Sequence, residues 1–326
     1  MLSRVADTIY WMNRHLERAE NYARFMDVNF NLTLEMPPDE TEQWRPLIVT
    51  TGDWLLYQSL YKKVEKRKSI YFLGFDEKNP NSIYSCIIKA RENARAVRPE
   101  ITKEVWEQIN NLYYHVKSGK EKKRWQNKDP RNFFIEVRKG CQLLNGIFDA
   151  TISRTDGWHF GKIGQLVERA DKTSRILDVK YHILLAAPES VGSPLDLMQW
   201  GALLKSVSAY DMYRKKYGRL SAAGITQFLT LDKDFPRSML RCLMQAEHSL
   251  YSITGNAEGH SNSAERHLGM LKSQLEYADI DEIINGGLHE YLDDFQRKLN
   301  EVSRAIFDSF FSTEKIINQS QYNQIQ

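Results

Sequence analysis

"ERAENYARFMDV", residues 17–28, and "ERADKTSRILDV", residues 168–179, repeat one charged pattern 151 residues apart. Their Glu, Arg, Ala, Arg, Asp and Val residues coincide. Around the first copy, apolar residues recur at steps of three and four, which places them on one face of a helix. The pattern therefore predicts one long helix over about 3–34 and a second over about 158–186.

Further segments repeat in the same order, at shifts that grow from 151 to 156 and then to 159 residues. The repeats pair Trp44 with Trp200, "FDEKNPNSIYSCIIKA" (75–90) with "LDKDFPRSMLRCLMQA" (231–246), and "IFDATIS" (147–153) with "IFDSFFS" (306–312). A shift that only grows is what small loop insertions between two copies produce. The chain is therefore predicted to be a duplication.

The fold class follows from this repeat and from composition. The chain has 326 residues, of which only 17 are Gly and 9 are Pro, and no segment alternates as a strand does. We expect an all-α protein made of two tandem copies of a helical-bundle unit, packed about a pseudo-twofold axis. The copies would span 1–152 and 153–317, followed by a polar tail at 318–326.

Within each copy the sequence predicts three further features. A second helical stretch is expected over about 44–64 and over about 197–217. Pro80 and Pro236 would each sit in the first turn of a third helix, where the missing N–H costs nothing. Thr102 is the expected N-cap of a helix that continues to about residue 116.

Charge and cysteine content exclude several classes of protein. The net charge is +3, and the densest basic run, 117–128, is typical of a solvated loop, so we expect no nucleic-acid partner. No stretch approaches the roughly 18 apolar residues of a membrane span. Three cysteines without a CxxC motif suit a reducing cytosol. We therefore expect a cytoplasmic protein that does not enter the membrane.

The repeated motif places ionisable side chains beside the buried face of its helix. At 100° per residue, Glu20 lies on the shoulder of the apolar stripe, and Glu17 and Arg24 lie one step further out. Glu168, Asp171 and Arg175 repeat this geometry. Two interpretations stand side by side: a half-buried salt-bridge network that docks the copies, or a polar cleft between them that receives a ligand.

Other chemistries have little support in the sequence. None of the eight histidines has a Glu three residues before it, so a carboxylate-bridged metal pair is not expected, and no Gly-rich loop indicates a cofactor. Cys86 and Cys242 have apolar neighbours and are expected to be buried rather than nucleophilic. Arg91, Glu92 and Arg95 are spaced as on one helix. They could form an anion-binding group or a solvated face with internal ion pairs.

Three separated motifs resemble a known family. "MLSRVADTIYWMNRHLERAENYARFMDV", "ARENARAVR" followed by "WEQINNLY", and "SRTDGWHFGKIGQLVERADKTSRILDV" are similar to the bacterial alpha-E domain proteins, and the resemblance runs from residue 1 to about 312. That family is all-helical and of unknown function. The resemblance implies that the motif residues are Glu17, Glu20, Glu92 and Glu168, with Asp171 in place of a glutamate, and Arg14, Arg18, Arg24, Arg91, Arg95, Arg169 and Arg175. Gln165 stands where the repeat of Arg14 would be, so the two polar halves should differ.

The resemblance also implies a functional setting. Members of the family typically occur beside, or fused to, a circularly permuted ATP-grasp amide-forming ligase, and often near a transglutaminase-like protein. The first hypothesis is therefore a helical component that partners the ligase and binds a peptide or amino acid between its copies. The second is an enzyme in which Glu17 or Glu168 acts as general acid or base. The third is a structural scaffold without a ligand.

Overall fold

The computed structural model describes residues 1–33, 40–127, 129–186, 192–256 and 262–312. All secondary structure in these ranges is helical, which confirms the all-α class. The predicted tail, 318–326, lies outside them. None of the helices in these ranges combines the length and apolar character needed to cross a bilayer. The elements are α1 Ser3–Thr33, α2 Glu40–Thr50, α3 Trp54–Leu60, α4 Lys66–Gly74, α5 Ile83–Ala96, η1 Arg98–Glu100, α6 Lys103–Glu121, η2 Arg124–Gln126, α7 Arg131–Thr151, α8 Asp156–Ala186, α9 Pro194–Ser206, α10 Tyr210–Tyr217, α11 Ala222–Leu231, α12 Met239–Thr254, α13 Ser263–Glu276, α14 Ile280–Gly286, α15 Leu288–Ile306 and η4 Phe307–Phe311.

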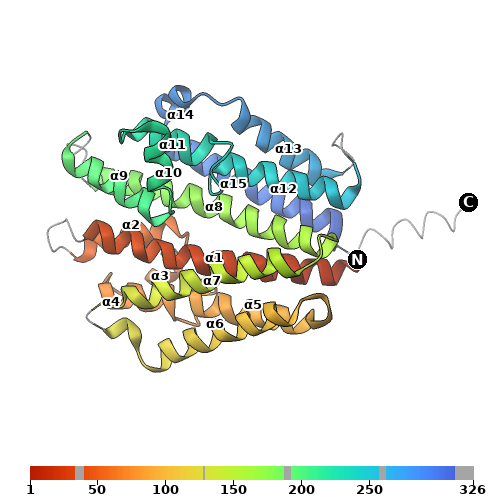
Figure 1. Ribbon diagram of the computed structural model, residues 1–326. Helices are drawn as coiled ribbons and strands as arrows, with labels where there is room; N and C mark the ends of the chain where they lie inside the picture. The colour runs from red at the N-terminus through yellow and green to blue at the C-terminus, as the bar shows by residue number, and fades with distance from the viewer. Residues whose placement is uncertain (34–39, 128, 187–191, 257–261, 313–326) are drawn as a thin grey trace, which may run out of the picture.

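The long helices form two groups of four. In one group α1 packs on α5 and α7, and α6 closes the ring by packing on both of these; in the other, α8 packs on α12 and α15, and α13 closes the ring. The groups lie one above the other in Figure 1 and join where α1 runs along α8. Whether they are copies of one unit stays a prediction, as do the proposed boundaries.

The shorter helices cross between the groups. Although α2 follows α1 in the chain, it makes its main contacts with α8, and α9 likewise packs chiefly on α1. The stretches predicted to be helical over about 44–64 and 197–217 are each divided into two helices. Gly52 breaks the first at a φ of +83°, and Ser208 breaks the second at a φ of +56°. Neither residue continues an α-helix in that conformation.

Helix starts follow the capping serines rather than the prolines. The side-chain oxygens of Ser82 and Ser238 accept hydrogen bonds from Ser85 N and Arg241 N, so α5 and α12 begin after the serines. The prediction that Pro80 and Pro236 occupy the first turn is therefore wrong, because both precede the caps. Thr102 caps α6 as expected.

Between Met12 and Asp27, helix α1 is buried around its circumference, with Arg18 alone partly exposed. Met12, Glu17, Tyr22 and Phe25 point in different directions around the helix, and all are at most 1% exposed. The single apolar stripe assumed from the sequence placed Glu17 and Arg24 too far outward. Four helices, α5, α7, α8 and α9, surround α1, so its polar side chains are enclosed as well.

The two central helices approach closely near their N-terminal halves. Gly164 of α8 lies against the backbone carbonyl of Tyr10 of α1, and a Cβ atom at Gly164 would overlap that oxygen. A glycine here lets the two backbones meet without an intervening side chain. The charged motif begins about two turns further along α1, at Glu17, and about one turn further along α8, at Glu168.

Candidate functional site

The two Glu-Arg pairs of α1 and α8 bind each other crosswise. Arg18 donates to Glu168, with its Nε 2.6 Å from Oε1, and Arg169 donates to Glu17, with its Nη2 2.7 Å from Oε2. Both glutamates are fully buried. The repeated motifs therefore do face each other, and each supplies half of one polar centre.

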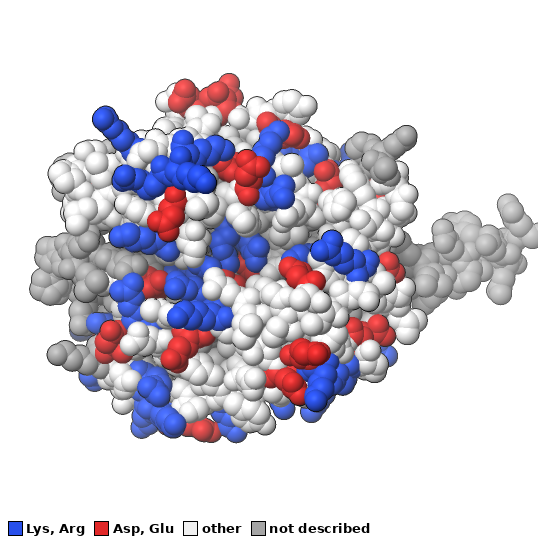
Figure 2. All heavy atoms as spheres, viewed as in Figure 1, with Lys and Arg blue, Asp and Glu red and all other residues white. Residues whose placement is uncertain are grey.

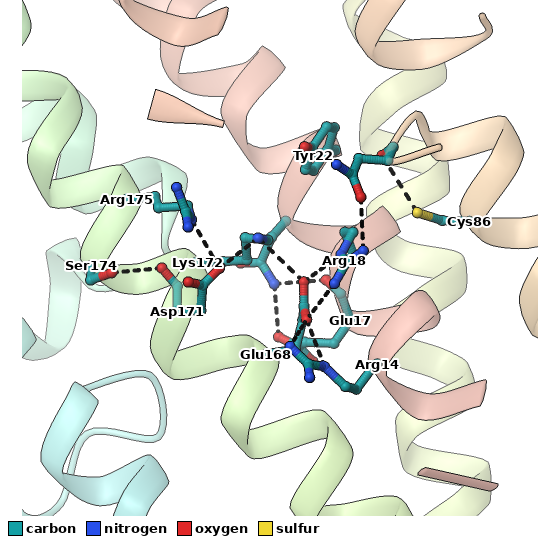
Figure 3. Close-up of polar contacts among 12 residues, drawn as sticks. Arg14, Glu17, Arg18, Tyr22, Cys86, Glu168, Asp171, Lys172, Ser174 and Arg175 are labelled. Carbon is teal, nitrogen blue, oxygen red and sulfur yellow. Dashed lines mark hydrogen bonds and ion pairs between the residues drawn. The ribbon is translucent and has the colours of Figure 1, made fainter. Parts of the chain in front are cut away.

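Glu168 sits in the middle of one half of this centre (Figure 3). Besides Arg18, it accepts from Arg14 Nε at 3.0 Å and pairs with Lys172 Nζ at 3.3 Å. Lys172 also donates to Asp171 at 2.6 Å. The carboxylates in this half are therefore each paired with basic side chains.

Glu17 and Glu20 form the other half. Here Arg237 takes the place that Arg14 and Lys172 have around Glu168. Arg237 comes from the linker before α12 and donates to both carboxylates, at 3.2 Å to Glu17. Glu20 also accepts from Arg24 Nη2 at 2.9 Å and from Asn145 Nδ2 at 3.3 Å. A residue far along the chain thus completes the environment of the first motif.

The second arginine of each motif also binds the end of a short helix. Arg24 Nη1 lies 2.7 Å from the Ser206 carbonyl at the end of α9, and Arg175 Nη1 lies 3.2 Å from the Thr50 carbonyl at the end of α2. These carbonyls have no partner within their own helices. The motif arginines therefore tie the crossing helices to the centre.

Buried carboxylates in this centre are held in the charged form. Burial alone would raise the pKa of Glu17, but Arg169 and Arg237 outweigh it and lower that pKa to about 2. Arg18, Lys172 and Arg14 likewise hold the pKa of Glu168 well below its usual range against the effect of burial. Burial, Arg237 and Arg138 together lower the pKa of the Arg24 guanidinium to about 10. On this side of the centre three cations, Arg24, Arg169 and Arg237, face two carboxylates, Glu17 and Glu20.

A pocket opens on that cationic side. It has a volume of about 300 Å³ and lies where α1, α7 and α8 meet the two linkers that contain Ser208 and Arg237. Figure 2 shows Lys and Arg side chains gathered around the hollowed face between α7 and the α9–α10 region, with fewer acidic ones among them. The lining residues are Glu20, Arg24, Gln142, Asn145, Arg169, Val207, Ser208, Phe235, Pro236 and Arg237.

The lowered carboxylate pKa values predict acid sensitivity. A depressed pKa stabilises the fold above the unfolded-state value of about 4.3 and loses that contribution as the pH falls toward the folded-state value. His15 acts in the same direction, because burial lowers its pKa to about 3 and the unfolded chain takes up the proton first. We expect the free energy of unfolding, measured in urea, to fall steadily from about pH 6 to pH 2. An unchanged free energy down to pH 2.5 would contradict these ionisation states.

The predicted site residues do not all meet. Glu17, Glu20, Arg24, Glu168, Asp171 and Arg175 lie in the centre. Arg91, Glu92 and Arg95 instead lie on α5. Arg91 faces α6, where its Nε donates to Asn110 at 2.8 Å and its guanidinium lies 4.6 Å from the Tyr113 ring, while Arg95 pairs with Glu92 at 2.6 Å on the exposed side of α5. Their partners belong to these two helices and not to the polar centre.

Sequence reasoning did not place Lys172 or Arg237 in the site. The signal for Arg237 was present, since it precedes the capping Ser238 as Asn81 precedes Ser82. Asn81 in turn accepts from Arg18 Nη1 at 2.8 Å. Both linkers therefore point a polar side chain into the centre, and only the second supplies a charge.

The cysteines and the residues that could bind a metal ion are not part of the ionic centre. Cys86 and Cys242 are buried as expected, and burial raises the pKa of each thiol to about 12. In the described ranges, Asp178, His289 and Asp293 are the group whose ligand atoms come close enough for a metal ion. His289 Nδ1 lies 2.8 Å from Asp178, so the imidazole is engaged as a hydrogen-bond partner.

Comparison with known proteins identifies a family and several relatives. The model of the Alpha-E family, described as a predicted alpha-helical domain with a conserved ER motif, matches residues 1–311. Uncharacterised proteins of Mycobacterium bovis and Mycobacterium tuberculosis are 21% identical over 332 residues, which covers 95% of this chain and 37% of each relative. No solved structure matches the chain. With its Glu-Arg pairs at 17–18 and 168–169 joined in one centre, the chain belongs to the Alpha-E family.

Proposed function

We propose that the chain is a binding component of a peptide- or amide-forming system and holds the carboxylate of an amino acid or peptide in the pocket at Arg24 and Arg237. The observation that carries this proposal is the excess of positive charge in that pocket. Arg24, Arg169 and Arg237 line it, while Glu20 is the acid among its lining residues. Arginine binds carboxylates through paired N–H donors, which makes an arginine-rich pocket suited to that group.

Size and neutral donors fit the same ligand class. A volume of about 300 Å³ is at the small end of ligand pockets, which suits an amino acid or the end of a peptide. Asn145 and Ser208 offer neutral hydrogen-bonding groups beside the arginines. Glu20 holds two arginines in place, so the cations are oriented before a ligand arrives.

The enzyme alternative has less physical support. A general acid or base works best with a pKa near the operating pH. The pKa of Glu17 is lowered to about 2, the pKa of Glu168 is lower than usual as well, and both carboxylates are enclosed by basic side chains. A scaffold without a ligand remains the second candidate, because the same ion pairs join the two helix groups.

We also propose that the two groups are copies of one unit and that an ATP-grasp ligase is the partner, with a transglutaminase-like protein as a further one. The crosswise Glu-Arg pairs support the first of these proposals. The family resemblance supports the second. Co-expression with an ATP-grasp protein, followed by size-exclusion chromatography, tests the partnership. Full ligase activity without this chain would count against it.

A charge change at the pocket rim tests the binding proposal. Thermal unfolding is measured with free amino acids, short peptides and ATP, since a ligand that binds the folded state raises the midpoint. Gln142, exposed on α7 at the rim, is replaced in Gln142→Glu. We expect the midpoint shift caused by carboxylate ligands to shrink, because the new charge repels them.

Asn111→Asp, on the exposed face of α6, is the matched control and should keep the full shift. If no ligand raises the midpoint of the unmodified protein, the centre is a docking network and the binding proposal fails. Equal shifts in the Gln142→Glu and control variants would place the ligand elsewhere.

A further inference from the structure

A second cavity lies on the same central helix, near its N-terminal end. It has a volume of about 500 Å³ and is bordered by the end of α7, the first turns of α8 and one face of α12. Lys162 and Arg169 lie seven residues apart on α8, so this cavity and the carboxylate pocket are separated by about 10 Å along that helix. The functional proposal above does not use this cavity.

The wall of the cavity is rich in cations and hydrogen-bond donors. Arg154 and Lys162 are its permanent cations, and His159 and His248 add two imidazoles. The acid on the wall, Asp149, is already paired with Lys162 at 3.1 Å. One positive charge and two imidazoles therefore remain for an incoming anion.

Trp158 fixes the positions of the two cations. The Arg154 guanidinium lies 5.3 Å from the centre of the indole ring, and Lys162 Nζ lies 5.5 Å from it. Cation–π contacts of this kind hold long side chains that would otherwise be mobile. Both cations are thus oriented in advance, which lowers the entropy lost when an anion binds.

The wall also contains unmet hydrogen-bonding capacity. Trp158 Nε1 and His159 Nδ1 are buried and have no hydrogen-bond partner within the described part of the chain. Buried polar atoms without partners are costly. Both nitrogens are closed off from solvent, so a bound oxygen reaches either of them only after the side chain rotates. A ligand with several oxygens around one atom matches this arrangement.

We propose that this cavity binds the phosphate group of a phosphorylated small molecule, as a second anion site separate from the carboxylate pocket. A phosphate dianion has more negative charge and more acceptor oxygens than a carboxylate, and it can accept from Arg154 and the two histidines at once. Burial and the neighbouring His248, with Arg154, lower the pKa of His159, while Asp156 raises it. A bound phosphate favours the protonated imidazole and so opposes that lowering.

The test uses inorganic phosphate as the probe and imidazole NMR signals as the readout. The full chain is titrated with phosphate at constant ionic strength, and the signals of His159 and His248 are followed. We expect saturable, concerted shifts of both signals and a rise in the pKa of His159. Arg154→Gln, at an exposed position, should weaken binding by about tenfold or more.

Two control variants locate the site. Arg214→Gln, exposed on α10, removes an arginine from another face and should leave phosphate binding unchanged, and so should Gln142→Glu. Shifts that grow linearly and match those given by chloride would overturn the proposal. Acetate binding as tightly as phosphate would overturn the phosphate assignment, and loss of binding in Gln142→Glu alone would place the anion in the other pocket.

Discussion

Glu168→Gln is expected to lower the free energy of unfolding by about 3–5 kcal/mol, the cost of removing one partner from a buried ion pair. Glu168 is fully buried and pairs with Arg14, Arg18 and Lys172. An amide keeps the shape of the side chain but removes the charge. The three cations then repel each other in a largely buried region. Urea unfolding at pH 7 measures the loss.

Glu92→Gln is the matched comparison for this change. Glu92 also pairs with arginines, at 2.6 Å to Arg95, but both side chains are substantially exposed to solvent. Exposed pairs contribute at most about 1 kcal/mol. Similar losses for Glu168→Gln and Glu92→Gln would show that the centre is hydrated and that its charges are screened.

Gly164→Ala should destabilise the protein by about 1–3 kcal/mol, as overpacking does in a close-packed interior. The added methyl group would overlap the Tyr10 carbonyl oxygen, which belongs to the backbone and cannot rotate away. A small side-chain movement cannot remove this overlap, so α1 and α8 must separate. Urea unfolding gives the loss, and the separation should also weaken the crosswise Glu-Arg pairs nearby.

Gly146→Ala on α7 supplies the control for the glycine change. A Cβ atom at Gly146 meets nothing within 4 Å. Alanine is the better helix former, so this substitution should stabilise the protein by about 0.5–1 kcal/mol. If Gly164→Ala also stabilises the protein, the two helices do not approach as closely at this point as described.

Periodicity in the sequence was sufficient to predict the central helices, but not their surroundings. The spacing of apolar residues predicted α1 and α8 to within a few residues. It did not show that helices cover α1 on all sides, because a period of 3.6 identifies one buried stripe and polar residues outside it are read as exposed. Glu17 and Arg24 were misplaced for that reason. The breaks at Gly52 and Ser208 depend on local backbone conformations that periodicity does not encode.

The motif predicted the ionic centre, whereas the pocket beside it depends on tertiary packing. Charge identity and spacing brought Glu17, Glu20 and Glu168 forward as candidates, and all three lie in the centre. The pocket also needs Gln142 from α7 and Arg237 from a linker, which no local pattern connects. Their meeting follows from the way the two helix groups pack, and a single sequence does not specify that.

The ion pairs around Glu17 join residues that are far apart in the sequence, and this affects folding during synthesis. Glu17 and Arg237 are separated by 220 positions along the chain. At roughly 5–20 residues per second, a ribosome needs on the order of 10–45 s to make that interval. Until Arg237 emerges, Glu17 and Glu20 lack a cation that the finished fold gives them. We therefore expect nascent chains to keep α1 accessible to solvent and to chaperones until most of the polypeptide has been made.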